Sequence, residues 1–305
     1  MDERGLLREI EPVAGELLNR HLGVAKEWFP HEMVPYSRGK DFVSGEQWKD
    51  SDTDFGAISN EMSDAVRASL YVNLLTEDNL PYYFRDIDQL FGNDGAYGEW
   101  GRNWTAEEGR HSIVIRDYLT VTRAIDPVAL ERARMQQVRS GQVPAPLDLY
   151  EALAYLSMQE LATRIAHRNT GKAMADEVGQ AIMSRVGNDE NLHYLFYRDL
   201  ATAAIAVDPS NMVIGIERAV RTFAMPGTGI TDFDRLSREI ARVGIYDLAI
   251  HHEQILVPVV LRHWKLADLT GLNSEAEKAR EALLKRIDRI GKVASKLAGD
   301  RITVK

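Results

Sequence analysis

The stretch GNDENLHYLF, residues 187–196, places a carboxylate and an imidazole on a helical face that is otherwise apolar. Met183 and Val186 precede it on the same face, at the spacing of a helix. Glu190 and His193, three residues apart, fall on that stripe, where burying charge is costly unless the charge is paired or bound to a metal. The stretch therefore predicts that other residues of the chain join these two in a polar site.

A second Glu-x-x-His pair occurs at Glu108 and His111. Two Glu-x-x-His pairs are close to the number expected by chance, so the pairs alone are weak evidence for a metal site. The stronger evidence is the residue that precedes each pair. A single Glu on an apolar helical face comes about thirty residues before each pair, namely Glu77 and Glu160. The chain thus reads Glu, then Glu-x-x-His, twice. This order is typical of four-helix bundles that hold two metal ions with carboxylates.

The chemistry of such a site explains the pattern. Four carboxylates in one core repel one another, and two divalent cations balance their charge. Oxygen ligands with a little imidazole suit iron, with manganese as the alternative. Six residues are therefore the predicted metal ligands: Glu77, Glu108, His111, Glu160, Glu190 and His193. Taken singly, each Glu could be a part-exposed helix residue and each His a core residue bonded to a backbone carbonyl.

Composition excludes several classes of protein. The 305-residue chain has a formal net charge of −9, which argues against a general nucleic-acid binder. It has no cysteine, so disulfides, a cysteine nucleophile and cysteine-held iron–sulfur clusters are excluded within this chain. The opening MDERGLLREI lacks the apolar core of a signal peptide, and no apolar run approaches the ~20 residues of a transmembrane helix. We expect a soluble, cytoplasmic protein.

The rest of the chain also favours helices, without a linker, so one all-α domain over residues 1–305 is expected. The predicted helical segments are 61–92, 104–123, 147–168, 174–206, 209–224, 231–264 and 274–297. Thr105 and Glu108 have the spacing of a capping box, which predicts a helix start there. Pro81 is expected to kink its helix beside Glu77. The stretch FPHEMVPYSRGKDF (29–42) is predicted to be a loop, and 226–233 is compatible with a short strand pair.

Several longer motifs resemble one known family, the soluble acyl-[acyl-carrier-protein] desaturases, especially their actinobacterial branch. The motifs are HLGVAKEWFPHE (21–32), LLTEDNLPYYFRD (74–86), WTAEEGRH (104–111), SMQELATRIAHRNTGKA (157–173), DENLHYLFYRDL (189–200), FAMPG (223–227) and HWKLADLTGL (263–272). The resemblance implies a ferritin-like four-helix bundle with additional helices, a homodimer, and two iron ions held by the six predicted ligands. It also implies that a cis double bond is introduced into a saturated acyl chain on acyl carrier protein, with dioxygen and two electrons from ferredoxin.

The resemblance assigns roles to three more residues. Thr163 matches a threonine on the oxygen-binding side of the metals, although a core threonine can equally bond to the carbonyl four residues earlier. Trp28 and Asp189 match positions that link the protein surface to the iron through His111. Packing of a large aromatic residue is the alternative for Trp28, and orientation of a ligand imidazole is a further role for Asp189.

Other observations bear on the reaction. The chain has neither cysteine clusters nor a Gly-rich dinucleotide fingerprint, so electrons are expected from a separate protein. Gly109 and Ser112 stand where the family commonly has Asn and Gly, and both flank the predicted site. Two other functions fit the ligand pattern: a ferritin-like di-iron hydroxylase or N-oxygenase, and a metal- or lipid-binding homologue without catalysis. The position of the double bond and the acyl chain length do not follow from the sequence.

Overall fold

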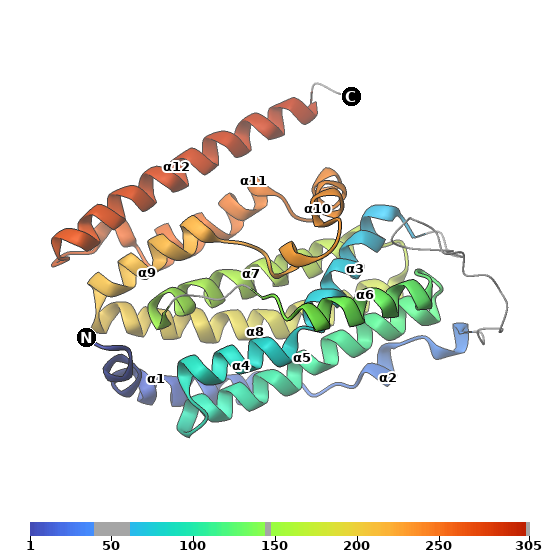
Figure 1. The fold of residues 1–305 in the computed structure, drawn as a ribbon, viewed down its shortest axis with the longest axis horizontal. Helices are drawn as coiled ribbons and strands as arrows, with labels where there is room; N and C mark the ends of the chain where they lie inside the picture. Colours follow the sequence, from blue (N-terminus) through green and yellow to red (C-terminus); the bar gives the residue numbers. More distant parts are fainter. Residues whose placement is uncertain (40–61, 144–147, 303–305) are drawn as a thin grey trace.

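The computed structural model of the chain describes residues 1–39, 62–143 and 148–302, and all regular structure in these ranges is helical (Figure 1). The α-helices are α1 (Glu3–Val24), α2 (Pro30–Met33), α3 (Asp64–Glu77), α4 (Leu80–Phe91), α5 (Gly95–Val121), α6 (Pro127–Ser140), α7 (Leu149–Ala173), α8 (Glu177–Val207), α9 (Pro209–Thr222), α10 (Phe233–Arg242), α11 (Leu248–His251) and α12 (Ser274–Ile302). A π-helical segment, η3 (His252–His263), continues α11, and η1 (Tyr36–Arg38), η2 (Pro226–Gly229) and η4 (Leu266–Asp268) are short 3-10 turns.

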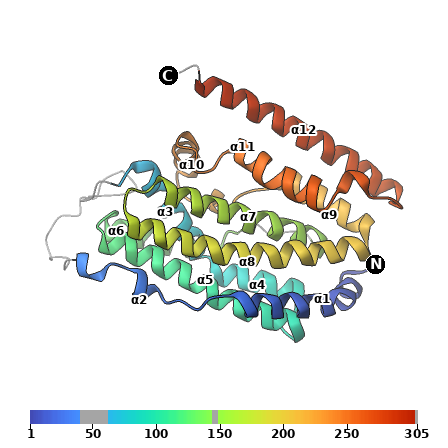
Figure 2. The ribbon, with the colours of Figure 1, turned by 180° about the vertical axis from the view of Figure 1, so that it is seen from behind.

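Four of these helices, α3, α5, α7 and α8, form the central bundle. The short connection between α7 and α8 makes them antiparallel neighbours, α3 packs against α5 and α7, and α5 packs against α8. Helix α1 lies along α8 and α5, whereas α9 packs against α7 on the opposite side of the bundle (Figure 2). Helix α12 packs against the outer side of α9. The predicted all-α, ferritin-like bundle with additional helices is confirmed.

Two apolar clusters fill the bundle, and α5 and α8 contribute to both. On α5, residues 97–104 belong to the first cluster and residues 114–119 to the second. On α8, residues 182–186 belong to the second cluster and residues 194–205 to the first. The segments between them, around Glu108 and Glu190, carry the predicted ligands. The polar site is therefore closed off by apolar packing at both ends of the bundle.

The predicted kink at Pro81 is a complete break. Helix α3 ends at Glu77, and α4 begins at Leu80 with Pro81 in its first turn. Proline lacks the amide hydrogen that a continuous helix would need there, and it suits the first turn of a new helix. The break places the carboxylate of Glu77 at the end of its helix.

Other details of the prediction are wrong. Helix α5 begins at Gly95, and Thr105 lies inside it, where its hydroxyl donates to the carbonyl of Gly101 at 2.6 Å. Residues 226–229 form a 3-10 turn, and the described chain has no strand near 226–233. Gly244, at φ +75°, ends the helical run predicted for 231–264. Helix α6 was not predicted, and the stretch 29–42 contains α2 and η1 up to Arg38, with 40–42 outside the described residues.

Candidate metal centre

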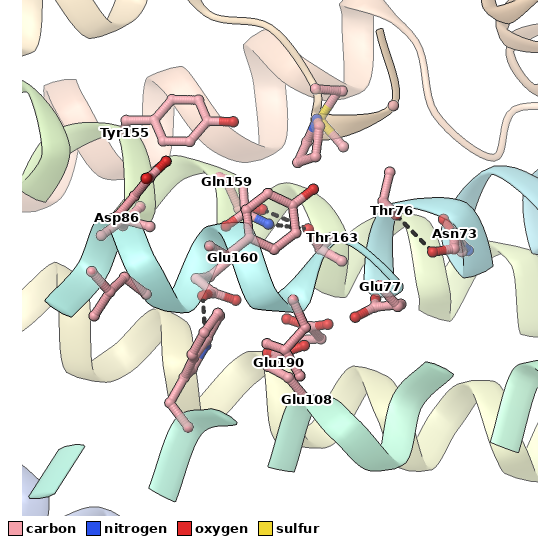
Figure 3. A pocket seen from close by; sticks show the side chains of 18 of the residues that line it. Asn73, Thr76, Glu77, Asp86, Glu108, Tyr155, Gln159, Glu160, Thr163 and Glu190 are labelled. Atoms are coloured by element: carbon pink, nitrogen blue, oxygen red, sulfur yellow. Dashed lines mark hydrogen bonds between the residues drawn. The ribbon is translucent and has the colours of Figure 1, made fainter. Parts of the chain in front are cut away.

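The structure brings all six predicted ligands together in the middle of the bundle. They form two overlapping groups, Glu77, Glu108, His111 and Glu190, and Glu108, Glu160, Glu190 and His193, in each of which one ligand atom per residue lies within 4.8 Å of the others. Figure 3 shows the four carboxylates turned toward one another from α3, α5, α7 and α8. Glu108 and Glu190 belong to both groups, so these are the two carboxylates that two cations could share.

Both histidines turn the same ring nitrogen toward the carboxylates. Nδ1 of His111 lies 3.1 Å from Oε2 of Glu108 and 3.9 Å from Oε2 of Glu77. Nδ1 of His193 lies 2.8 Å from Oε1 of Glu108 and 3.8 Å from Oε2 of Glu160. The Glu then Glu-x-x-His repeat of the sequence is thus a two-fold repeat in space, with one imidazole at each end.

The arrangement fits a pair of divalent cations. All six side chains are buried, and such burial of charge is costly without compensation. Although Nδ1 of His193 lies 2.8 Å from a carboxylate oxygen, neither it nor Oε2 of Glu190 makes a hydrogen bond of acceptable geometry. Oxygen donors with one imidazole at each end are the ligand set that iron and manganese prefer. Two metal ions would satisfy these atoms and balance the four carboxylates.

Without cations, the electrostatics of the site favour bound protons. Burial, together with the charge of Glu108, raises the pKa of Glu77 to about 8. Burial and the charge of Glu190 raise the pKa of Glu160 well above its ordinary value. At Glu190, burial acts in the same direction, but hydrogen bonds from His111 and His167 outweigh it and hold its pKa well below the ordinary value. Protons thus take the place of metal charge in the metal-free protein.

We expect metal binding at pH 7 to release protons. Between the ordinary Glu pKa of 4.5 and about 8, the folded metal-free protein holds a proton on Glu77 that the unfolded chain does not. This group therefore destabilises the metal-free fold increasingly as pH rises through that window. Each proton displaced by metal should raise the apparent metal affinity by up to about tenfold per pH unit. Calorimetry of Fe²⁺ or Mn²⁺ binding in two buffers of different ionisation enthalpy measures this release, and an affinity independent of pH between 6 and 8 would contradict it.

A chain of contacts leads from His111 toward the surface. Its outer nitrogen, Nε2, lies 3.5 Å from Oδ2 of Asp189, which accepts a hydrogen bond of 2.7 Å from the indole N–H of Trp28. The rings of Trp28 and His111 are stacked, with centroids 6.4 Å apart. Burial raises the pKa of Asp189, but the hydrogen bonds from His111 and Trp28 outweigh it and leave that pKa below its ordinary value. The structure therefore brings Trp28 and Asp189 together beside one end of the site.

His193 has a different outer partner, which sequence reasoning missed. Its Nε2 lies 2.8 Å from Oε2 of Glu107, and Glu107 in turn lies 3.1 Å from Nε2 of the buried His21 on α1. Burial opposes ionisation of Glu107, but the two histidines outweigh it and hold its pKa well below the ordinary value. Glu107 was not predicted because adjacent residues of a helix point in different directions. Its position next to Glu108 in the sequence therefore does not indicate that its side chain contacts the site.

A third buried histidine touches the site directly. Nε2 of His167 lies 3.4 Å from Oε1 of both Glu77 and Glu190, and its Nδ1 lies 3.3 Å from the amide nitrogen of Asn73. Burial lowers its pKa, but the nearby carboxylates of Glu190 and Glu77 outweigh this and raise the pKa to about 9. A signal was present in the sequence, because His167 follows Glu160 by two helical turns and therefore shares its face.

A cavity of about 980 Å³, which includes space open to solvent, adjoins the ligands. Its walls are formed by α3, α4, α5, α7, α8 and the segment that contains η2, and Figure 3 shows side chains that line it. The lining includes the predicted ligands Glu77, Glu108, Glu160 and Glu190, the polar residues Asn73, Thr76, Asp86, Gln159 and Thr163, and the apolar or aromatic residues Val72, Leu80, Tyr83, Ile87, Leu90, Trp104, Ala152, Tyr155, Leu156, Ala166 and Met225. The cavity is thus mostly apolar and ends on one side at a cluster of carboxylates.

Thr163 lines this cavity, one turn after Glu160. Its hydroxyl donates to the backbone carbonyl of Gln159 at 2.9 Å and accepts from the Gln159 side-chain amide at 2.8 Å. Trp104, which was not predicted as a site residue, donates its indole N–H to Oε1 of Glu160 at 3.2 Å. Both residues therefore stand where the cavity meets the second half of the ligand cluster.

No helix in the described part of the chain is both long and apolar enough to cross a lipid bilayer. The family model described as "Fatty acid desaturase" matches residues 2–305. A Mycobacterium tuberculosis protein named as an acyl-[acyl-carrier-protein] desaturase, DesA1, is 41% identical over 288 residues, which cover 91% of this chain and 83% of the relative.

More distant relatives extend the comparison to plants. The chloroplast stearoyl-[acyl-carrier-protein] 9-desaturase 2 of Oryza sativa is 28% identical over 320 residues, which cover 96% of this chain and 78% of the relative. Among solved structures, DesA2 of Mycobacterium tuberculosis matches with a TM-score of 0.69 at 23% identity, covering 90% of this chain and 99% of that one. This last likeness concerns the fold.

Proposed function

Because the chain belongs to the fatty acid desaturase family, we propose that it is an acyl-[acyl-carrier-protein] desaturase that introduces a cis double bond into a saturated acyl chain. The observation that carries this proposal is the junction of an apolar cavity with a buried cluster of four carboxylates and two imidazoles. An apolar cavity suits a hydrocarbon chain, and the cluster stands beside it. The carrier is proposed from the names of the relatives.

Six residues would hold the two iron ions: Glu77, Glu108, His111, Glu160, Glu190 and His193. Bound there, the metal pair would supply the activation of dioxygen that removal of two hydrogen atoms from an alkyl chain requires. The overall balance needs a donor of two electrons, because the acyl chain supplies two electrons and dioxygen takes four to become two waters. Manganese is the alternative metal for the same ligand set.

The protein's own residues have separate tasks in this reaction. The apolar cavity walls would bind the acyl chain and exclude water from the metals. Asp189 and Glu107 accept from the outer nitrogens of His111 and His193, which keeps Nδ1 of each ring free to bind metal. We propose that the hydroxyl of Thr163 turns from the Gln159 carbonyl toward the cavity, where it would be available to donate a hydrogen bond beside Glu160.

Electrons are proposed to enter from ferredoxin through Trp28, Asp189 and His111. The chain has no cysteine with which to hold an iron–sulfur cluster of its own. The ligands are buried, so a protein donor would be unable to touch the metals. Trp28 is next to the exposed Phe29 in the chain and its ring is stacked on the buried His111, so it offers a series of contacts from the surface inward.

A homodimer in the cytoplasm is the form that the resemblance to this family implies. Light scattering of the purified protein tests the dimer, and fractionation of cells tests the location.

One experiment separates this function from the two alternatives. The protein loaded with iron is incubated with palmitoyl- or stearoyl-carrier protein, ferredoxin and a reductant, and the released acyl chains are analysed by mass spectrometry. A chain lighter by two hydrogen atoms supports desaturation, whereas an added oxygen atom indicates a hydroxylase. Unchanged acyl chains with no dioxygen consumption would favour a binding protein without catalysis. Oxygen consumption with an amine substrate but not with acyl chains would favour an N-oxygenase.

A larger side chain in the cavity should shorten the acyl chain that the protein accepts. Leu156 lines the cavity from α7, and Leu156→Trp adds volume there. We expect kcat/KM for the longest substrate to fall by about tenfold or more, with a smaller loss for a shorter one, because each excluded methylene forfeits roughly 0.8 kcal/mol. Rates with a series of acyl lengths measure this. Leu195→Trp, on α8 and outside the cavity lining, is the control. Equal losses at every length in Leu156→Trp would contradict the proposal.

A further inference from the structure

Two arginine side chains stand over the indole ring of Trp28. The guanidinium carbon of Arg110 lies 5.1 Å from the ring centroid, and that of Arg185 lies 5.7 Å from it. The two side chains are 18% and 17% exposed, and the indole is buried. Such distances allow cation–π attraction, and burial limits the screening of both charges by water.

Both guanidinium groups are held in place by further contacts. Each pairs with Asp189, at 3.4 Å for Arg110 and 2.5 Å for Arg185. Arg110 also donates to the carbonyl of Trp28 at 3.4 Å, and Arg185 donates to the carbonyl of Lys26 at 2.9 Å. The two charges are therefore fixed to the backbone that carries the indole, as well as to its hydrogen-bond partner.

This arrangement has opposite effects on the two oxidation states of Trp28. A neutral indole is attracted to a cation through its negative ring face. An indole that has lost an electron carries positive charge, and both guanidinium groups then repel it. Asp189 contributes one negative charge at the indole N–H, and Glu107 lies 3.9 Å from Arg110. The two guanidinium groups stand over the ring itself, and these two cations oppose its oxidation.

We infer that Arg110 and Arg185 protect Trp28 from losing an electron to the oxidant that forms at the metal centre. The source of that oxidant rests on the proposed function. In the reaction that is suppressed, the indole gives one electron to the oxidant, and the N–H proton of the resulting radical cation passes to Asp189. Dioxygen then adds to the ring radical. Inward electron transfer is not impeded, because it does not require Trp28 to be oxidised.

Paired substitutions separate the effect of charge from that of shape. Arg110→Met removes the charge and keeps a long side chain, whereas Arg110→Lys keeps the charge; Arg185→Met and Arg185→Lys repeat the pair. Each single change leaves Asp189 with its other arginine and with Trp28. Arg221→Gln, on α9 and paired with Glu217, is the distant control.

The readout is oxygen added to the Trp28 peptide, measured by mass spectrometry and normalised to the Trp104 peptide of the same molecule. In one arm, a photogenerated one-electron oxidant acts from solvent on the metal-free full-length protein. In the other, the reduced iron-loaded protein is exposed to dioxygen without acyl substrate. We expect about tenfold more Trp28 oxidation in each Met variant than in the wild type, and near wild-type values in the Lys variants and the control. Circular dichroism verifies that each variant is folded.

The two arms distinguish failure of this inference from failure of the proposed function. Equal Trp28 oxidation in the Met, Lys and wild-type proteins with the photogenerated oxidant would overturn the inference, whatever reaction the protein catalyses. Equal increases in the Met and Lys variants would also overturn it, because shape and not charge would then be the cause. Trp28 oxidation in the Met variants could also increase with the photogenerated oxidant but not with dioxygen. The arginine charges would then protect Trp28, but the metal centre would not be the source of the oxidant.

Discussion

Glu108→Ala is expected to lose both metal ions and to reduce turnover to below about one hundredth. Glu108 belongs to both ligand groups, so its removal takes one oxygen donor from each metal. Removing a residue that only hydrogen-bonds to a metal ligand commonly lowers metal affinity or activity by about 10- to 100-fold. Removing a ligand that both metals share should lower them further. Glu77→Ala, which touches one group, should weaken one site more than the other. Elemental analysis of the purified variants and titration with Fe²⁺ measure these differences.

The stability of the metal-free form provides a second readout for the same variant. Metal bound to the folded state raises the melting temperature, so loaded wild-type protein should melt above its metal-free form. Metal-free Glu108→Ala should melt below metal-free wild type, because His111 and His193 outweigh burial and hold the pKa of Glu108 below its ordinary value, and both buried imidazoles lose this carboxylate partner. Glu99→Ala, at an exposed position of α5, is the matched control and should keep metal and activity. Full metal occupancy in Glu108→Ala and Glu190→Ala would show that the cluster is not the metal site.

Trp28→Ala is expected to keep its metals while losing more than about tenfold of ferredoxin-supported desaturation. The variant removes the indole that lies against His111 and donates to Asp189. Asp189 still pairs with Arg185 and lies beside His111, so the ligand remains oriented. A small reductant such as dithionite should restore turnover, because it can approach by other routes. Rates with each reductant, together with metal content, measure this selectivity.

Trp28→Phe serves as a second variant, since truncating a buried tryptophan to alanine commonly costs about 3–5 kcal/mol of stability. Phenylalanine retains most of the packing and lacks the N–H group. Retained metal with selective loss of the ferredoxin-supported rate assigns the residue to electron entry. Equal loss with both reductants would mean that Trp28 is structural, and unchanged ferredoxin-supported rates would mean that electrons enter elsewhere.

The grouping of the six predicted ligands could be predicted because it depends largely on spacing within single helices. Glu108 with His111, and Glu190 with His193, share a helix face at three residues' distance, and the repeat supplied the remaining two carboxylates. The partners beyond the six residues differ in this respect. His21 reaches Glu107 from α1, so that contact depends on how helices far apart in sequence pack. His167 shares the face of Glu160, which gave a signal in the sequence, and only its contact with Glu77 depends on packing.

Helix boundaries show the same limit. Asp126 caps α6 by accepting from the amide of Val128 at 2.8 Å, and Pro127 occupies the first turn of that helix. Thr105 gave a false start signal, because a threonine hydroxyl can also bond to the carbonyl four residues earlier within a helix. Local signals thus mark the sites at which a helix can begin, and packing decides which of them are used.

The two apolar clusters that share α5 and α8 bear on how the protein unfolds. Between them lies a segment of bundle whose interior is carboxylate and imidazole, so it contributes little apolar cohesion of its own. In the metal-free protein, the two clusters can open as separate cooperative units, each with its own protection of backbone amides from hydrogen exchange. Cations bound to ligands from all four bundle helices would join the two units into one. We therefore expect the metal-free protein to unfold in more steps than the metal-loaded protein, which hydrogen exchange of both forms would measure.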